Sequence, residues 1–262
     1  METEALDLQQ IPQTTLQAVY LRAKATQADP HTIDDQKAVE IVSQLDYDFS
    51  QLNSDPALSR SILSRTILLD RMVEDFLTEH PGAVVMNIAC GLDARGDRMA
   101  GKYARWYNLD VPEVMALRRR FFPEAEHQID LSFSITDKRW GKKINQISEP
   151  VLVIAEGLTM YLEEERVQAL FAAIRSRFTH CTVFVEAAPP RSVPRVKAEE
   201  ENGTAFKWGV KSGSAMQSLI PAFRCVKDVS LVEGMQDFAP MHKFMGRLGF
   251  TGSAHKILVF EK

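Results

Sequence analysis

Apolar residues recur every three or four positions through the first 80 residues of the chain, with polar residues between them. One face of an α-helix has this spacing when it packs against a core. The pattern predicts helices over residues 15–24, 34–45 and 61–77. The sequence His80-Pro81-Gly82 then ends the helical pattern, because proline and glycine both interrupt a helix.

Beyond this break the apolar positions form short, continuous runs. Such runs predict strands over residues 83–89, 104–110, 126–131, 151–155, 182–186 and 256–260. A helical pattern over residues 163–178 separates the fourth run from the fifth. Apolar strands that alternate with helices are typical of a parallel sheet covered on both faces. We therefore expect an α/β fold with a doubly wound sheet and an N-terminal helical extension.

Composition and charge narrow the class of protein. The 262 residues include 31 Lys and Arg against 35 Asp and Glu, which gives a formal net charge of −4. This balance argues against a general binder of nucleic acid or of anionic membranes, since such proteins carry a clustered basic surface. The three cysteines are widely spaced and match neither a disulfide framework nor a zinc pattern, so we predict no metal site.

The chain has no sequence signal for a membrane or for secretion. Its first ten residues are polar and acidic, and its longest apolar run, residues 151–162, is interrupted by Glu156. A membrane-spanning helix needs about 20 apolar residues, and a secretory signal has a basic start and an apolar stretch. We therefore expect a cytoplasmic protein.

Acidic residues follow four successive predicted strands, at Asp93, Asp110, Asp130 and Glu156. In a doubly wound sheet, ligands bind in the crevice beyond the carboxyl ends of the strands. Because parallel strands all end at the same edge of the sheet, we expect these four carboxylates to surround one crevice.

The first of these strands runs into a turn of small residues, Ala89-Cys90-Gly91, which lets a ligand approach the backbone. A dinucleotide site needs a third glycine here, and Asp93 would repel a pyrophosphate. Asp110 lies 19 residues beyond Gly91, which is the spacing of a ribose-binding acid. The pattern thus favours an adenosine-containing ligand without a pyrophosphate over a nicotinamide cofactor. The alternatives are that Gly91 only shapes a tight turn and that Asp110 is an exposed loop acid.

Several segments resemble, in the same order, the signature segments of the leucine carboxyl methyltransferase family, which includes the tetracenomycin-type polyketide O-methyltransferases. Residues 87–95 (NIACGLDAR) are similar to the family's NLGAGLDTR, and residues 156–162 (EGLTMYL) are similar to EGVLMYL. Shorter matches are residues 64–66 (SRT, for ART), 109–114 (LDVPEV, for VDLPEV), 130–131 with Trp140 (DL…W) and 206–209 (FKWG, for F-x-W-G). The resemblance extends from residue 15 to the end of the chain.

The resemblance implies a class I methyltransferase that uses S-adenosylmethionine and has a mostly parallel, seven-stranded, Rossmann-like sheet. The cofactor-binding residues that it implies are Arg22, Arg65, Ala89, Cys90, Gly91, Asp110, Val111, Asp130, Leu131 and Glu156. An acid-lined crevice attracts the ammonium and sulfonium of this cofactor, while an arginine suits its one carboxylate.

Each implied residue has an expected role. Arg65 and Arg22 would hold the cofactor's carboxylate, above a turn that passes under its methionyl part. Asp110 would accept the ribose hydroxyls. Residues 130–131 would frame the adenine, and Glu156 would meet the amino end. The chain departs from the family at two positions of the turn segment, with alanine at 89 in place of glycine and at 94 in place of threonine.

The expected methyl acceptor is a carboxylate or a phenolic hydroxyl of a small, polyketide-like molecule, with Tyr161 and Trp208 as acceptor-side residues. The alternatives are that Tyr161 only packs at the start of a helix and that Trp208 is a core anchor. A carboxylate needs no base, whereas a phenol benefits from one. No histidine–acid pair stands out near the motifs, which favours a carboxylate. The alternatives are a protein C-terminal carboxyl methyltransferase and a non-catalytic cofactor-binding relative.

We expect a single domain, in which residues 1–80 form a helical lid, 83–186 the cofactor-binding core and 187–262 a substrate wall with the last strands.

Overall fold

The computed structural model describes residues 8, 11–31, 33–52, 55–137, 139–144, 147–194, 205–232 and 255–262. Part of the predicted substrate wall, residues 195–204 and 233–254, lies outside the described residues. In the part of the chain that the structure describes, no helix is long and apolar enough to cross a membrane, and no cluster of side chains has the composition of a metal site.

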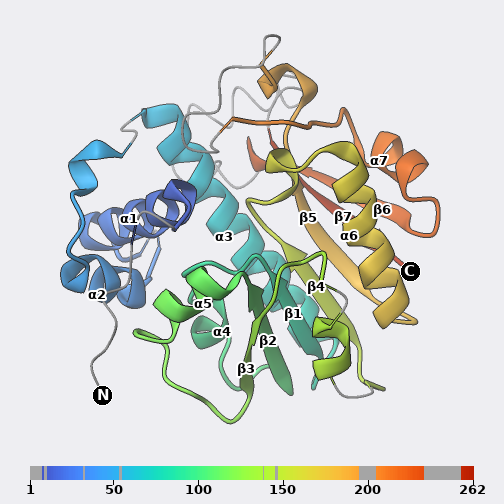
Figure 1. The fold of residues 1–262 in the computed structure, drawn as a ribbon, viewed down its shortest axis with the longest axis horizontal. Helices are drawn as coiled ribbons and strands as arrows, with labels where there is room; N and C mark the ends of the chain where they lie inside the picture. Colours follow the sequence, from blue (N-terminus) through green and yellow to red (C-terminus); the bar gives the residue numbers. More distant parts are fainter. Residues whose placement is uncertain are drawn as a thin grey trace.

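A seven-stranded sheet forms the centre of the molecule, with the strand order β3-β2-β1-β4-β5-β7-β6 (Figure 1). Its strands are β1 (Val84–Ile88), β2 (Arg105–Asp110), β3 (Gln128–Ser132), β4 (Val151–Ala155), β5 (Thr182–Ala187), β6 (Arg224–Ser230) and β7 (Lys256–Glu261). Neighbouring strands from β3 to β5 are parallel. β7 runs antiparallel to both of its neighbours, β5 and β6.

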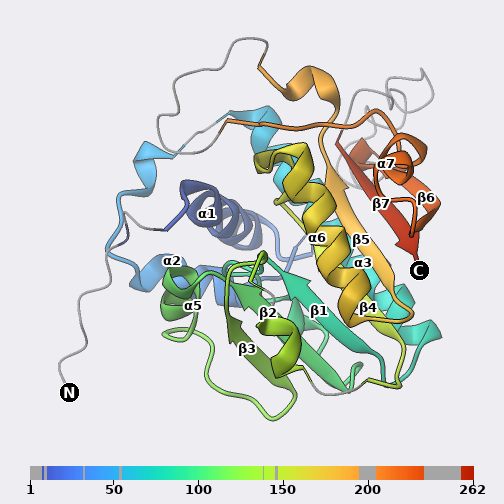
Figure 2. The ribbon, with the colours of Figure 1, turned by 45° about the vertical axis from the view of Figure 1, so that its right-hand side comes forward.

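Helices cover both faces of this sheet, and Figure 2 shows α6 and α3 on opposite sides of it. The helix α3 (Pro56–Glu79) packs its apolar side on one face, through residues such as Leu69 and Val73. The helices α6 (Glu164–Arg177) and α7 (Gly213–Leu219) pack on the other face. The central strands β1 and β4 are buried along their whole length, which explains why their sequences are apolar on both faces.

A third apolar cluster lies beyond the carboxyl edge of the sheet. It joins α1 (Gln13–Ala28) and α2 (Gln36–Gln44) to α5 (Pro112–Arg118), the helix that follows β2. The side chain of Asp35 caps α2 by accepting a hydrogen bond from the backbone N–H of Ala38 at 3.0 Å. The N-terminal helices therefore cover the end of the sheet where ligands bind in folds of this type.

The predicted fold class is confirmed, and each of the six predicted strands is present within a few residues of its expected bounds. The strand that the pattern did not predict is β6, whose sequence RCVKDVS is mostly polar. β6 lies at the edge of the sheet and five of its seven residues are not buried, so it has no apolar run to reveal it. The short helices α4 (Arg95–Arg98) and η4 (Thr159–Tyr161) follow β1 and β4 near the site.

Candidate active site

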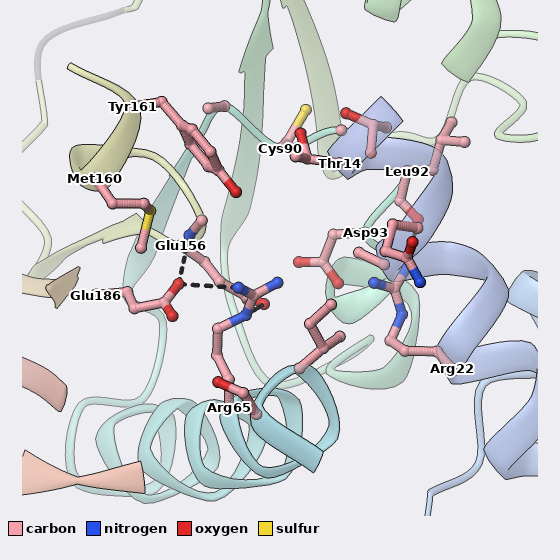
Figure 3. Close-up of a pocket in the computed structure, with 18 of the residues that line it drawn as sticks. Thr14, Arg22, Arg65, Cys90, Leu92, Asp93, Glu156, Met160, Tyr161 and Glu186 are labelled. Carbon is pink, nitrogen blue, oxygen red and sulfur yellow. Dashed lines mark hydrogen bonds and ion pairs between the residues drawn. The ribbon is translucent and has the colours of Figure 1, made fainter. Parts of the chain in front are cut away.

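A cavity of about 400 Å³ opens at the carboxyl edge of the sheet, between the strands and the N-terminal helices. Its wall is formed by α1, by α3, by the turn after β1 and by the segments that follow β4 and β5. Figure 3 shows Tyr161 and Glu186 on one side of this space and Arg22 and Asp93 on the other.

The turn after β1 has an unusual backbone conformation. Both Ala89 and Gly91 are in the left-handed region, with φ values of 53° and 50°. Glycine adopts this conformation readily, whereas an L-residue with a side chain pays about 1–2 kcal/mol. The turn is tightly covered by α1, because a Cβ atom placed on Gly91 would lie 3.2 Å from Cγ2 of Thr15.

The carboxylate of Asp110 holds this turn in place. The backbone N–H of Gly91 donates to Oδ2 at 2.8 Å, and that of Val111 donates to Oδ1 at 2.8 Å. Burial raises the pKa of Asp110, although both hydrogen bonds act in the opposite direction. Each carboxylate oxygen keeps a further lone pair for a ligand hydroxyl.

Arg118, the last residue of α5, also stabilises this turn, through its backbone carbonyls. Its side chain is 1% exposed, and Nη1 donates to the backbone carbonyls of Gly91 and Asp93 at 3.2 and 2.7 Å. The guanidinium also lies over the ring of Phe122, 3.9 Å from its centroid. The turn is therefore held by a carboxylate on the N–H of Gly91 and by a guanidinium on the carbonyls of Gly91 and Asp93.

Arg65 of α3 lies between two carboxylates on the cavity wall. Its Nε donates to Oε1 of Glu156 at 2.6 Å, and its Nη1 donates to Oε2 of Glu186 at 3.0 Å (Figure 3). Nη2 has no hydrogen-bond partner among the described residues. Burial alone would lower the pKa of Arg65, but the two carboxylates raise it above its usual value.

Arg95 connects this pair to the β1 turn. It is 1% exposed, and its three donor groups reach three carboxylates: Nε to Asp70 at 2.6 Å, Nη1 to Asp93 at 2.8 Å and Nη2 to Glu156 at 2.9 Å. Burial would raise the pKa of Asp93, yet Arg95 and its neighbours hold it below its usual range. These buried ion pairs lock α3, the β1 turn and the end of β4 into one geometry.

Arg22 stands on the opposite side of the cavity. Its Nε donates to Oδ2 of Asp35 at 2.7 Å, and its Nη2 donates to the backbone carbonyl of Leu92 at 3.0 Å. Nη1 has no hydrogen-bond partner in the described part of the chain. The cavity wall thus carries two guanidiniums, Arg22 and Arg65, each with one terminal nitrogen left for a ligand.

A histidine–carboxylate pair also borders the cavity. Nδ1 of His255 lies 3.1 Å from Oε1 of Glu186, a residue that is 1% exposed. The other oxygen of Glu186 accepts the backbone N–H of Gly157 at 2.8 Å, in addition to Arg65. Burial would raise the pKa of Glu186, but Arg65 and His255 lower it to about 2, so the carboxylate is ionised at neutral pH.

The comparisons with known proteins agree with this site. Residues 15–175, more than half of the chain, match the model of the leucine carboxyl methyltransferase family. The chain belongs to the leucine carboxyl methyltransferase family. The resemblance, the predicted methyltransferase class and the predicted cofactor, S-adenosylmethionine, are thereby confirmed.

Two curated proteins are similar over most of their length. The tetracenomycin polyketide synthesis O-methyltransferase TcmP of Streptomyces glaucescens is 29% identical over 249 residues, covering 93% of this chain and 92% of that protein. The S-adenosyl-L-methionine-dependent methyltransferase dpfgK of Gibberella zeae is 28% identical over 237 residues, covering 81% and 79%.

Solved structures confirm the fold. The magnesium protoporphyrin IX methyltransferase ChlM from Synechocystis, solved with bound S-adenosylmethionine, has a TM-score of 0.51 at 11% identity and covers 99% of each chain. An S-adenosylmethionine-dependent methyltransferase from Anabaena variabilis has a TM-score of 0.50 at 11% identity, with 76% of this chain and 84% of that one covered.

The residues of this family member fit the charges of the cofactor. The cavity wall carries Arg22 and Arg65 against Asp93, Glu156 and Glu186, an excess of one carboxylate. S-Adenosylmethionine carries two positive centres and one carboxylate, which complements this wall. The free nitrogens of the two arginines suit the carboxylate, because guanidinium pairs with carboxylates through directed N–H donors.

Most predicted cofactor residues lie on the cavity wall. The lining includes Arg22, Arg65, Ala89, Cys90, Gly91 and Glu156. Asp110 and Val111 do not line it but adjoin it through the hydrogen bond to Gly91.

The thiol of Cys90 is buried 3.8 Å from Sδ of Met115, and this burial raises its pKa well above the usual value. Cys90 therefore contributes backbone, not a reactive thiolate.

Three predicted residues lie elsewhere than expected. Asp130 lies within β3, paired with Asn108, and not after the end of the strand. Its Oδ1 accepts a hydrogen bond from Nδ2 of Asn108 at 3.1 Å. Leu131 is 5% exposed and belongs to the hydrophobic core, because side chains alternate between the two faces of a strand.

Trp208 also packs into the core and does not line the cavity. It is 7% exposed, and its indole N–H donates to Glu164 at 3.1 Å. Its neighbour Phe206 lines the cavity instead, together with Tyr161, with ring centroids 5.3 Å apart in an edge-to-face arrangement. The structure therefore agrees with Trp208 as a core anchor, and Phe206 is the aromatic residue of this segment that lies at the cavity.

Glu186 and His255 are site residues that the sequence reasoning missed. Glu186 stood at the end of the fifth predicted strand, so the rule that found the other acids could have found it. His255 precedes β7, and only the antiparallel direction of that strand brings its start to the carboxyl edge of β5. The sequence alone gave no sign of that direction.

Proposed function

We propose that the protein is an S-adenosylmethionine-dependent O-methyltransferase that acts on a small, polyketide-like molecule carrying a carboxylate or a phenolic hydroxyl. The observation that carries the proposal is the cavity wall, where an excess carboxylate and two guanidiniums with free nitrogens meet an aromatic side. The names of the two curated relatives agree with this class of reaction, since one is a polyketide O-methyltransferase and the other an S-adenosylmethionine-dependent methyltransferase.

Within this proposal, Arg65 and Arg22 hold the carboxylate of the cofactor through their free terminal nitrogens, and Glu156 and Asp93 attract its ammonium. The carboxylate of Asp110 accepts the ribose hydroxyls while it holds the turn. The segment of residues 130–131 borders the adenine through β3. The three-part organisation belongs to the proposal as well: residues 1–80 cover the site, residues 83–186 hold the cofactor and residues 187–262 supply the acceptor wall.

The cofactor supplies an activated methyl group, so the protein contributes alignment and exclusion of water. Alignment of two reactants contributes up to about 7–11 kcal/mol in ideal cases. The locked ion pairs of Arg65 and Arg95 keep the cofactor side rigid, and α1 covers the turn, which limits the access of water to the reacting atoms. Tyr161 and Phe206 form the surface on which a flat acceptor rests.

Calorimetry with S-adenosylhomocysteine tests whether the protein binds the cofactor, and mass spectrometry of acceptor mixtures tests which molecules it methylates. We expect binding with a dissociation constant in the micromolar range, equivalent to about −8 kcal/mol. We also expect a mass gain of one methylene on aromatic acids or phenols. No binding of S-adenosylhomocysteine or S-adenosylmethionine at millimolar concentration would contradict the proposal.

A further inference from the structure

The pair formed by Glu186 and His255 has the geometry of an oriented base. Glu186 is ionised, and an ionised carboxylate can only accept hydrogen bonds. The contact at 3.1 Å therefore requires that Nδ1 of His255 carries the proton. In the neutral form of the ring, the lone pair is then on Nε2, which has no hydrogen-bond partner among the described residues. A histidine oriented in this way by a carboxylate accepts a proton at its second nitrogen.

We infer that His255 is the general base of the reaction and that the methyl acceptor is an aromatic hydroxyl group. This inference rests on the proposed function and selects one of its two acceptor classes. A carboxylate acceptor is already ionised at neutral pH and has no proton for a base to remove. A phenol, with a pKa near 10, is protonated and must lose its proton. Methyl transfer to a carboxylate therefore does not require an imidazole that is oriented by Glu186.

The surroundings of His255 suit an aromatic ring. Its imidazole lies 5.6 Å from the ring of Phe206, which in turn packs edge-to-face against Tyr161. All three line the cavity, and Met160 lies beside them. Aromatic rings prefer stacked or edge-to-face contacts with other rings, and a planar acceptor satisfies this preference. The imidazole then lies beside the aromatic wall against which a planar acceptor would rest.

The other titratable groups on this side are poor bases. Burial raises the pKa of Tyr161 to about 12, so its hydroxyl stays protonated. Glu186 is held near pKa 2 and already binds Arg65, Gly157 and His255. Glu156 is engaged by two arginines, at 2.6 and 2.9 Å. Among the described residues that line the cavity, His255 is the histidine, and its Nε2 has no hydrogen-bond partner there.

The step balances without a further reactant. The O–H bond of the acceptor breaks, and its proton passes to Nε2 of His255. The electron pair on the acceptor oxygen forms the new O–CH3 bond, while the methyl–sulfur bond breaks and its electron pair stays on sulfur. The imidazolium that forms is stabilised by Glu186 until it releases its proton to solvent. The carboxylate also orients the ring through Nδ1, as in other histidine–carboxylate pairs.

His255→Asn tests this role because it separates the hydrogen bond to Glu186 from the acceptance of a proton at Nε2. The amide of asparagine keeps an N–H donor close to the position of Nδ1, so the contact with Glu186 persists, but no basic nitrogen remains. His180→Asn is the matched control, since His180 is exposed and belongs to no part of the site. Calorimetry with S-adenosylhomocysteine should give the same affinity for the wild type and both variants.

Hydroxybenzoates serve as acceptors because one ring offers both a carboxylate and a phenol. Alkali cleaves a methyl ester and leaves an aryl methyl ether, which separates the two products. We expect the ether from the wild type and a loss of about 100- to 10,000-fold in kcat/KM with His255→Asn. A dinitrophenol, which is ionised at neutral pH, should restore most of the lost rate. Ester as the main product, or an unchanged rate of ether formation in the variant, would overturn the inference.

A second measurement does not depend on turnover. Long-range 1H–15N NMR at pH 8 distinguishes an imidazole with its proton on Nδ1 from one with its proton on Nε2, and His255→Asn assigns the signal. We expect the Nδ1–H form. A proton on Nε2 would overturn the inference and leave the proposed function standing. Absence of S-adenosylhomocysteine binding by the wild type would instead contradict the proposed function.

Discussion

Nε of Arg65 lies 2.6 Å from Oε1 of Glu156, which joins the middle of α3 to the segment after β4 across 91 residues of sequence. The same guanidinium reaches Glu186 with Nη1 and keeps Nη2 unpaired among the described residues. The planar fork of one arginine therefore makes two structural contacts and, in the proposed function, one contact with the cofactor. A lysine in its place keeps the charge but not the fork.

We expect Arg65→Lys to weaken the binding of S-adenosylhomocysteine by about tenfold or more, since a hydrogen bond to a charged group contributes about 1.5–3 kcal/mol. Isothermal calorimetry measures the change. Arg60→Lys, at an exposed position of the same helix, is the control and should bind as the wild type does. Equal affinity of Arg65→Lys and wild type would remove Arg65 from the cofactor site.

Asp110→Ala should weaken the binding of S-adenosylhomocysteine more than it lowers stability. The substitution removes the acceptor of the ribose hydroxyls and the partner of two backbone N–H groups, those of Gly91 and Val111. Each unpaired group costs about 1–3 kcal/mol where water does not replace the partner. Calorimetry and thermal unfolding measure the two effects, with the exposed Asp46→Ala as control. Unchanged affinity would contradict the role of Asp110.

Ala89→Gly should stabilise the protein, because Ala89 is in the left-handed region at φ 53°. Relief of about 1–2 kcal/mol is partly offset by the greater flexibility of glycine in the unfolded chain, which leaves a gain of up to about 1 kcal/mol. The melting temperature should rise by about 2–4 °C.

The matched opposite change is Gly91→Ala. Its φ of 50° disfavours alanine, and the added Cβ would lie 3.2 Å from Cγ2 of Thr15. We expect a lower melting temperature and weaker cofactor binding. If the two variants shift the melting temperature in the same direction, then the strain argument for this turn is wrong.

Acid should destabilise the protein through Glu186. Its pKa is lowered from 4.5 to about 2 on folding, so the group contributes stability above pH 4.5 that is lost as the pH falls towards 2. The contribution at neutral pH is about 3 kcal/mol. Chemical unfolding between pH 3 and pH 7 should be less dependent on pH in Glu186→Gln than in the wild type. Glu165→Gln, at an exposed position of α6, should retain the wild-type dependence.

The hydrophobic pattern predicted the interior of the fold well because the central strands are buried on both faces. It failed at β6, whose residues are exposed at the sheet edge. The positions of Asp93 and Glu156 at the cavity were predicted because parallel strands all end at one edge. Asp130 was expected at the same edge, but it pairs with Asn108 inside β3, and the sequence does not reveal that partner.

The acceptor side was much harder to predict. A tryptophan has the same sequence signature whether it packs into a core or lines a cavity, and Trp208 packs next to the α6 residue Glu164. The pair of Glu186 and His255 joins residues 69 positions apart, and their contact depends on the direction of β7. Arg95 gave no chemical signal beyond its place in a motif, because its function is to hold three carboxylates that meet only in the folded chain.

The position of β7 has a consequence for the order in which the protein is built. β7 is the last strand in the sequence, yet it lies inside the sheet, between β5 and β6. During synthesis, residues 256–261 leave the ribosome after all the segments of the cofactor side, so β5 and β6 lack their common neighbour until then. Because a domain folds as a unit, the sheet is completed only when β7 has been made. His255 arrives with that strand, so the residue proposed to deprotonate the acceptor is among the last to be synthesised.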